Sequence, residues 1–406
     1  MANQSLFENS LNRLKFFFAV SGLILERRKV VRWQITKKRC IYIINTIWLS
    51  IEVIGSIFWF IDNIKNGKDM AELTTITPCS LIATLSKFKT LYLIINERSV
   101  NDLVDILREL DVNEMDFNIE AKNIIAKKEK RTLDSVIKSF NALSFGLLVA
   151  FSFMPLILIA IKYVETKELE LALPFLVLYP FDSFNIKYWP FVYLKQIWSE
   201  SVVLSDMCAS DYFYYICCTY IRIQFRFLSY EFENLIPNKH NKRDDDQSDI
   251  KQKIIKLIKW HQRLIRSTNT LELIYSKSTL INFISSSAII CLTGFNVTIM
   301  NDVVILSSFV TFLFLSLLQI FFLCFFGDML MSASMEVSDA VYNSLWYIVD
   351  RGVAKDLLLV QIRAHTPCKL TAFGFSDVNL TSFAKIISSS WSYFALLNTI
   401  YSNKQN

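Results

Sequence analysis

VVILSSFVTFLFLSLLQIFFLCFF, residues 303–326, is the stretch that decides the fold, because its 24 residues include no charged side chain. A helix rises about 1.5 Å per residue and the hydrocarbon core of a bilayer is about 30 Å thick, so roughly 20 apolar residues cross it. Residues 303–326 therefore predict a membrane-spanning helix.

Six further stretches are long and apolar enough to be compared with it. Three are nearly free of charge: 41–61, 136–161 and 279–300. Three are interrupted by polar or charged residues: 74–95, 190–211 and 384–401. Because 53% of the chain is apolar, 20% is charged, and both Gly and Pro are scarce, long helices are favoured over sheets. We predict an all-α membrane protein with seven transmembrane helices.

The distribution of Lys and Arg indicates which end of the chain lies in the cytoplasm. Residues 1–39, 96–135, 233–272 and 328–380 carry 29 of the 43 basic residues, and the alternating loops with the carboxy-terminal end carry 6. We therefore expect the amino terminus inside and the carboxy terminus outside. The net charge of +6 then describes loops that face anionic lipid, and no nucleic-acid partner is expected.

The first apolar run, LKFFFAVSGLIL at residues 14–25, has two interpretations. Its length suits the core of a signal peptide. However, the charged residues Glu26, Arg27, Arg28 and Lys29 follow it directly, and a full span begins soon after. We favour an amphipathic cytoplasmic helix lying at the membrane interface.

The helical pattern after Pro190 does not stop at the membrane face. It continues to Pro237, which gives a helix of roughly 70 Å at the usual rise per residue. A second amphipathic segment, residues 250–275, leads directly into the fifth span. Together these extensions predict a packed cytoplasmic helical domain, the anchor domain, on which subunits could associate.

The sequence contains no recognised motif of catalytic or metal-binding residues. The three histidines, His240, His261 and His365, have no metal-ligand spacing, and no phosphate-binding, nucleophile or metalloprotease motif occurs. The eight cysteines are scattered and predict free thiols. We expect no enzyme activity, catalytic residue, metal site or cofactor.

Three longer stretches resemble a known family. The segments GDMLMSASMEVSDAVYNSLWY (327–347) and TPCKLTAFGFSDVNLTSFAKIISSSWSYFALLNTIY (366–401) are similar to the carboxy-terminal signature of insect odorant receptors. YPFDSFNIKYWPFVYLKQIW (179–198) resembles that family's approach to its fourth span. The chain resembles a ligand-tuning subunit more than the obligate co-receptor of the family.

The resemblance implies a function and a setting. It implies an odorant receptor in the cell membrane of olfactory sensory neurons, which acts in sensory transduction. It also implies a volatile-ligand-gated, non-selective cation channel, formed as a heterotetramer with the co-receptor. Each last helix would line the pore, and each subunit would hold a pocket for a small volatile ligand in its outer half.

The expected segments follow from topology and resemblance together. They are a cytoplasmic amino-terminal segment with an interfacial helix (1–40), spans 1 to 4 with the outer ligand pocket (41–232), a cytoplasmic helical segment (233–275), spans 5 and 6 (276–330), a further cytoplasmic segment of the anchor domain (331–380), and the pore-lining seventh span with a short extracellular tail (381–406).

A volatile ligand offers few polar atoms, so its pocket should be mainly apolar and aromatic with a few orienting groups. The outer halves of the spans supply the candidate ligand-binding residues Ile76, Thr77, Ser80, Phe151, Phe153, Tyr188, Tyr193, Trp198 and Phe309. The alternative for each aromatic residue is ordinary packing between helices.

The last span has a polar stripe when its residues are placed at about 100° per residue. Ser388, Ser392 and Thr399 fall on one face, Leu396 on its shoulder and Ile400 on the adjoining strip. Such a stripe suits a water-filled pore with an apolar constriction. Alignment to the family's Tyr-Phe marker implies that Leu396 and Ile400 form the gate and that Thr399 influences ion selectivity. Small polar residues also pack helices together, which accounts best for Ser389 and Ser390.

Two other functions remain open. A metabotropic seven-helix chemoreceptor would need the opposite orientation and its own Asp-Arg-Tyr and Asn-Pro-x-x-Tyr motifs, which the sequence lacks. A membrane transporter would be expected to show paired broken helices or mid-span carboxylates that recur between its halves, and no such recurrence is present.

Overall fold

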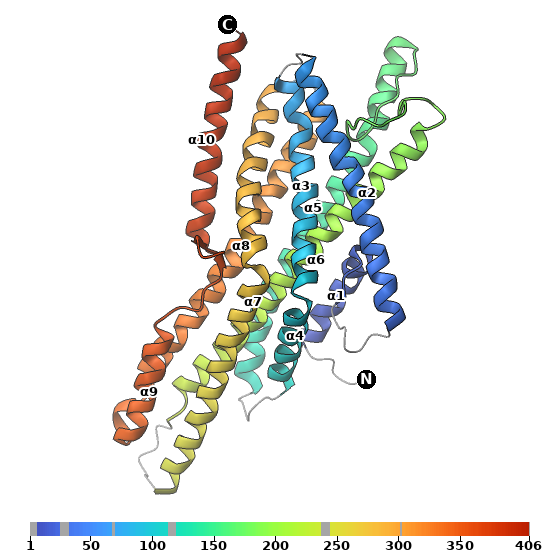
Figure 1. Ribbon diagram of the computed structural model, residues 1–406. Coiled ribbons are helices and arrows are strands. Elements are labelled where there is room, and N and C mark those ends of the chain that lie inside the picture. Colours follow the sequence, from blue (N-terminus) through green and yellow to red (C-terminus); the bar gives the residue numbers. More distant parts are fainter. Residues whose placement is uncertain are drawn as a thin grey trace.

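A computed structural model describes residues 6–24, 32–66, 70–112, 119–236, 244–300 and 303–405. Nearly all of these residues are helical, and the long helices run along one common axis (Figure 1). The elements are α1 (Leu6–Ser21), α2 (Arg32–Lys65), α3 (Met70–Ile95), α4 (Glu97–Val112), α5 (Ile119–Thr166), α6 (Trp189–Glu233), α7 (Asp244–Ile299), α8 (Val303–Asn343), η2 (Trp346–Ile348), α9 (Arg351–Ala364), β1 (Thr371–Ala372), β2 (Ser376–Asp377) and α10 (Leu380–Gln405). The all-α prediction is confirmed.

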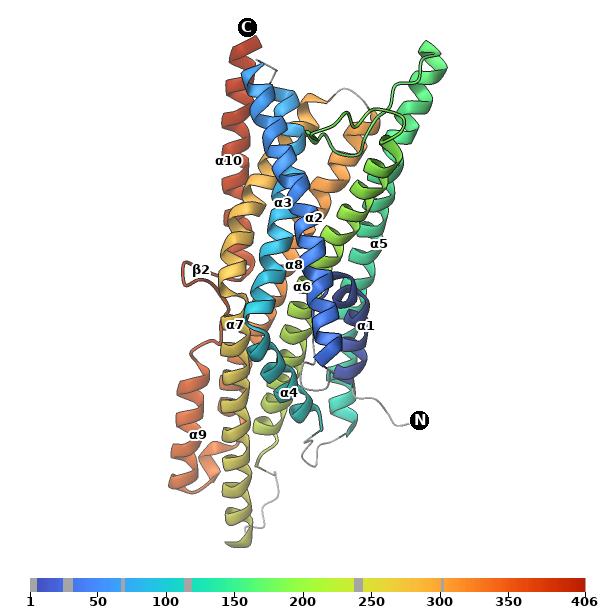
Figure 2. The same ribbon diagram turned by 45° about the vertical axis from the view of Figure 1, so that its right-hand side comes forward.

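Each predicted span lies within one long helix, except that the span 279–300 extends one residue past the end of α7. Among the described residues, five helices are long and apolar enough to cross a membrane: α2, α3, α5, α7 and α8. The two remaining spans lie in α6 and α10, which carry more polar side chains and stand beside the other five in the upper half of both views (Figure 2). The protein is a seven-transmembrane helical membrane protein.

Helix α6 forms the centre of the bundle. Its aromatic run Tyr212 to Tyr215 is at most 1% exposed, because helices surround it on every side. The Tyr215 ring stacks on Phe326 of α8 at 4.7 Å between centroids, and Tyr214 meets Tyr275 of α7 edge-on at 5.1 Å. The aromatic run therefore lies in the core of the bundle, where α6 contacts α1, α3, α5, α7 and α8.

The lower half of the bundle is built from α1, α4, α9 and the extensions of α5 to α8 (Figure 1). Helix α1 packs on α6: Phe7 is fully buried and lies edge-on to Tyr220 with 5.0 Å between ring centroids. Phe16, on the opposite face of α1, is 68% exposed. The interfacial helix expected near the amino terminus is thus one-sided, and its apolar face packs into the bundle.

A short hairpin connects α9 to α10. Strands β1 and β2 pair antiparallel, and the backbone after β2 passes close to Gly327 of α8. A Cβ added at Gly327 would overlap the carbonyl oxygen of Val378, so the absence of a side chain allows this approach. Asn379 precedes α10 and caps it, because its side-chain oxygen accepts a hydrogen bond of 2.9 Å from the Ser382 backbone N–H.

Candidate functional site

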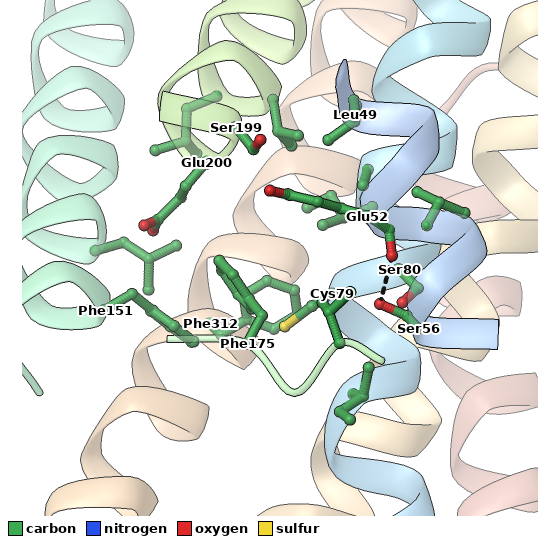
Figure 3. Close-up of a pocket in the computed structure, with 18 residues that line it drawn as sticks. Leu49, Glu52, Ser56, Cys79, Ser80, Phe151, Phe175, Ser199, Glu200 and Phe312 are labelled. Atoms are coloured by element: carbon green, nitrogen blue, oxygen red, sulfur yellow. Dashed lines mark hydrogen bonds between the residues drawn. The ribbon is translucent and has the colours of Figure 1, made fainter. Parts of the chain in front are cut away.

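A cavity of about 90 Å³ lies in the upper half of the bundle. Helices α2, α3, α5, α6 and α8 all contribute to its wall, together with the loop of residues 167–188 between α5 and α6 (Figure 3). Its lining is mainly apolar: Leu49, Glu52, Val53, Ser56, Ile76, Cys79, Ser80, Ile82, Ala83, Leu147, Phe151, Phe175, Val177, Ser199, Glu200, Val203, Leu204 and Phe312. Convergence of five helices and a loop on one apolar space is typical of a small-molecule site.

The α5–α6 loop is held over the cavity at two points. The fully buried Gln196 side chain accepts from the Phe175 N–H and donates to the Phe175 carbonyl oxygen, each at 3.0 Å. On the other side, the Leu178 N–H donates to the Gly55 carbonyl oxygen of α2 at 3.2 Å. A Cβ added at Gly55 would lie 2.5 Å from Val177 Cγ1, so this contact requires glycine.

Three phenylalanine side chains form one apolar wall of the cavity, at the lower left of the view in Figure 3. The ring of Phe151 stacks on Phe175 at 6.0 Å between centroids and meets Phe312 edge-on at 6.4 Å. These rings come from α5, the loop and α8, so they join three elements that are distant in sequence. The contacts give the cavity a rigid aromatic surface suited to an apolar ligand.

Two carboxyl groups are the strongest polar feature of the wall. Glu52 of α2 is 7% exposed, and its Oε1 lies 3.6 Å from the Lys195 ammonium. The Lys195 ammonium also lies over the rings of Trp48 and Tyr179, at 5.5 and 5.1 Å. The Oε2 atom of Glu200 is buried, and within the described part of the chain it has no hydrogen-bond partner.

A second cavity of about 40 Å³ lies beside the first, deeper in the bundle. Ile82, Leu147, Leu204 and Phe312 line both cavities and therefore separate them. Gln319, on the far wall, donates to Asp211 Oδ2 at 3.1 Å. The two cavities thus lie in line between the α5–α6 loop and the buried charges at the centre of α6.

Those buried charges form two ion pairs between α3 and α6. Lys87 lies 2.6 Å from Asp206, and Lys89 lies 2.7 Å from Asp211. Charged groups are costly within a membrane span and persist when they are paired. The lysines and aspartates lower the mean hydropathy of these two spans, but in the folded protein they pair with each other.

The structure brings three of the nine predicted ligand-binding residues to the cavity: Ile76, Ser80 and Phe151. The other six do not line it: Thr77, Phe153, Tyr188, Tyr193, Trp198 and Phe309. Among these, Phe153, Tyr188 and Trp198 are 56%, 47% and 51% exposed. Tyr193 is buried elsewhere, stacked on Trp189, and its hydroxyl donates to the carbonyl oxygen of Ser152.

Helix phase explains most of these differences. Phe153 is two residues after Phe151, which turns it by about 200°, so the two rings face opposite sides of α5. On α8, Phe312 faces the cavity, whereas Phe309 is buried outside it. Phe175, Glu200 and Phe312 line the cavity but were not predicted from the sequence. Glu200 carried a usable signal, because an ionisable residue inside a span is by default a candidate functional residue.

Helix α10 packs on α7 through one face. On that face, Ser390 is 1% exposed and donates to Ser287 Oγ of α7 at 3.1 Å. The predicted role of Ser390 in helix packing agrees with this contact. The predicted pore residues Ser388, Ser392, Leu396, Thr399 and Ile400 are all exposed in the single chain.

A groove of about 730 Å³ runs between α7 and α10. Leu396 and Ile400 line this groove, whereas Ser388, Ser392 and Thr399 do not. The polar stripe and the two bulky residues thus occupy neighbouring strips of α10, in the order that helix geometry predicts.

The chain is similar in sequence to known proteins. A family model described as 7tm Odorant receptor matches residues 69–391. The chain is 26% identical to Odorant receptor 67c of Drosophila melanogaster, over 86% of this chain and 85% of that protein. It is 27% identical to Putative odorant receptor 92a of the same species, over 86% and 84%.

Solved structures with the same fold include the olfactory receptor OR5 from Machilis hrabei. The chain matches that structure with a TM-score of 0.79 and 16% identity, over 96% of this chain and 97% of that one. It matches the complex of the same receptor with eugenol with a TM-score of 0.80 and 18% identity, over 97% and 98%. At these identities the likeness concerns the fold.

Proposed function

The chain belongs to the odorant receptor family, and on that premise we propose that it is a ligand-tuning subunit of a cation channel opened by a volatile ligand. As a member of this family the protein is a chemoreceptor of the membrane and not an enzyme. In the proposed complex it acts with the family's co-receptor as a heterotetramer in the cell membrane of olfactory sensory neurons.

The cavity beneath the α5–α6 loop is the proposed ligand site. Its wall combines three aromatic rings with a few polar groups, which matches the chemistry of a small volatile molecule. Eugenol is the ligand named for the olfactory receptor of Machilis hrabei, which has the same fold. The cavity volume of about 90 Å³ is small compared with the apolar cavity of about 150 Å³ that takes a benzene molecule. A compact ligand is therefore favoured.

The proposed pore depends on α10. A helix that faced lipid all round would not favour Ser388, Ser392 and Thr399 on one strip, and in the single chain these residues are exposed. We propose that neighbouring subunits cover α10 so that this strip lines a water-filled conduit. Leu396 and Ile400, at the edge of the strip, would then form an apolar gate.

The lower half of the bundle is the proposed anchor domain. It consists of α1, α4, α9 and the extensions of α5 to α8, which the distribution of Lys and Arg assigns to the cytoplasm. On α9, Leu358, Leu359 and Ile362 are 53%, 66% and 61% exposed. A cluster of exposed apolar side chains on a segment outside the membrane suits contact with another subunit.

The experiment that tests this function records current from cells that express the chain with the family's co-receptor. The proposal predicts a ligand-evoked cation current that persists when G-protein signalling is blocked. Loss of the response under the block would instead favour a metabotropic receptor. A panel of compact volatile molecules serves as the ligand source, and cells that express the co-receptor alone provide the control.

A further inference from the structure

We propose that the cavity beneath the α5–α6 loop binds a small volatile amine, whose nitrogen forms an ion pair with Glu200. This inference rests on the proposed function, since it specifies the ligand of the same site. It follows from the charges around the cavity, from the position of the Glu200 carboxyl group and from the size of the space.

The charges around the cavity do not balance. Two acidic residues line it, Glu52 and Glu200. The Lys195 ammonium lies 3.6 Å from Glu52 and so serves that carboxyl group. Lys87, the next cation along the bundle, is 2.6 Å from Asp206. Within the described ranges, no lysine or arginine pairs with Glu200, which leaves one acidic group without a cation.

The position of Glu200 makes this imbalance accessible to a ligand. Its side chain extends from α6 toward α5, and its carboxyl group lies above Phe151 and to the left of the Glu52 carboxyl group in the view of Figure 3. The Oε2 atom is buried and has no hydrogen-bond partner in the described residues. A buried carboxyl oxygen without a partner costs free energy, and a ligand that donates a hydrogen bond to it removes that cost.

An amine fits this position better than other small polar molecules. An ammonium group supplies both the missing positive charge and N–H donors, so its hydrogen bond to a carboxylate is charge-assisted. An alcohol can donate a hydrogen bond but cannot supply the charge. An amine that enters uncharged accepts the proton of a neutral carboxyl group, and one that enters as ammonium pairs with a carboxylate. Both routes end in the same ion pair.

The rest of the cavity limits the carbon skeleton of the amine. A space of about 90 Å³ is smaller than the cavity of about 150 Å³ that holds benzene, so a ligand of roughly six heavy atoms or fewer is expected. The rings of Phe151, Phe175 and Phe312 give this skeleton an apolar surface, and an aromatic face also attracts an ammonium group.

Binding to the purified full-length receptor provides the test, because it does not depend on channel opening. The probes are isopentylamine and isopentanol, which have the same carbon skeleton, and the readout is the rise in melting temperature with probe concentration. The wild-type receptor should bind the amine at least tenfold more tightly than the alcohol. Equal binding, or tighter binding of the alcohol, would overturn the proposal.

Substitution of Glu200 assigns the preference to one residue. Glu200→Gln keeps the size of the side chain but cannot carry the charge, so the preference for the amine should fall below threefold. Glu233→Gln, an exposed glutamate on the same helix, should keep the wild-type preference. Retention of the preference in Glu200→Gln would overturn the assignment. If Glu200→Gln does not fold, Glu200→Asp takes its place. Glu200→Asp should prefer the amine over the alcohol less strongly than the wild-type receptor does. A preference as strong as that of the wild type would overturn the assignment to Glu200.

Recordings from cells separate this inference from the proposed function. When the amine binds through Glu200 but neither probe evokes current with the co-receptor present, the ligand assignment stands and the channel function fails. When isopentanol evokes a current but the amine neither binds more tightly nor acts at lower concentration, the channel function stands and the amine assignment fails.

Discussion

The Lys89 ammonium lies 2.7 Å from the Asp211 carboxylate, and the two side chains are 4% and 2% exposed. The pair joins α3 to the centre of α6, and Gln319 of α8 donates to the second carboxylate oxygen of Asp211 at 3.1 Å. Three helices therefore meet at one carboxylate. This contact explains how two charged residues are accommodated inside the predicted spans.

Removal of one partner of this pair should be strongly destabilising. Lys89→Met leaves Asp211 without its cation, and breaking a buried pair from one side typically costs about 3–5 kcal/mol. Thermal unfolding of the purified receptor measures the loss, and the double variant Lys89→Met with Asp211→Leu should recover most of it. Lys162→Met, which breaks the exposed pair with Glu170, should cost less than about 1 kcal/mol. Equal losses for Lys89→Met and Lys162→Met would contradict the role of the buried pair.

The wall between the two cavities should set the length of the ligand. Phe312→Ala joins the cavity of about 90 Å³ to the one of about 40 Å³, so longer ligands should gain potency. Each buried methylene contributes about 0.8 kcal/mol, so a gain of roughly fourfold is expected for one additional carbon. Dose–response curves for a homologous series of alcohols measure this shift.

Phe314→Ala is the matched control for that series, because Phe314 lies on the same helix and is 51% exposed. It should leave the rank order of the alcohols unchanged. A Phe312→Ala receptor with the wild-type rank order would show that this ring does not limit the ligand site.

Close contact between α2 and the α5–α6 loop should be required for the ligand response. In Gly55→Ala the new Cβ lies 2.5 Å from Val177 Cγ1, so the loop must move away from the cavity. We expect ligand potency to fall by about tenfold or more, which corresponds to about 1.4 kcal/mol of binding free energy. Gly146→Ala on α5, where an added Cβ meets nothing within 4 Å, should keep normal potency. Normal potency in both variants would separate the loop from ligand binding.

The helices were predicted from the sequence, whereas the cavity contains three of the nine predicted ligand-binding residues. Long apolar runs decide where helices such as α5 and α8 lie, because the membrane core allows few alternatives. The more polar stretches were also predicted as helices, although the charges of Lys89 and Asp211 neutralise each other only after folding. A hydropathy profile contains no information about which residue on another helix neutralises a charge.

The site depends on quantities that a single sequence does not fix. Phe151 and Phe153 looked equivalent until the rotation of α5 placed one in the cavity and the other 56% exposed. Phe175 lies in a loop, and the hydrogen bonds of Gln196 determine where it sits. Contacts over long sequence separation therefore selected the lining residues.

Acidification should destabilise the lower half of the bundle through His261. Burial, with a smaller contribution from the nearby Arg363 charge, lowers the pKa of His261 to about 4. The ordinary value is about 6.5, so the unfolded chain binds a proton first as the pH falls. The stabilisation is complete above pH of about 6.5 and is lost between that value and about 4, by roughly 3 kcal/mol in total.

Thermal unfolding of the purified receptor between those two pH values measures this loss. His261→Phe removes the titrating group and should flatten the curve over this range. His365→Phe is the matched control, because His365 is exposed and its replacement does not alter the core. A His261→Phe receptor with the wild-type slope would exclude His261 as the cause.

Cysteine modification tests the proposed role of α10 in lining an ion pore. Ser392→Cys and Ser390→Cys are each expressed with the co-receptor, and a water-soluble thiol reagent is applied while ligand-evoked current is recorded. Ser392 is exposed on the polar strip, whereas Ser390 is 1% exposed against α7. We expect the reagent to change the current of Ser392→Cys and to leave the currents of Ser390→Cys and of the unmodified sequence unchanged. If the reagent labels the cysteine of Ser392→Cys and the current stays unaltered, the proposal that α10 lines the pore is contradicted.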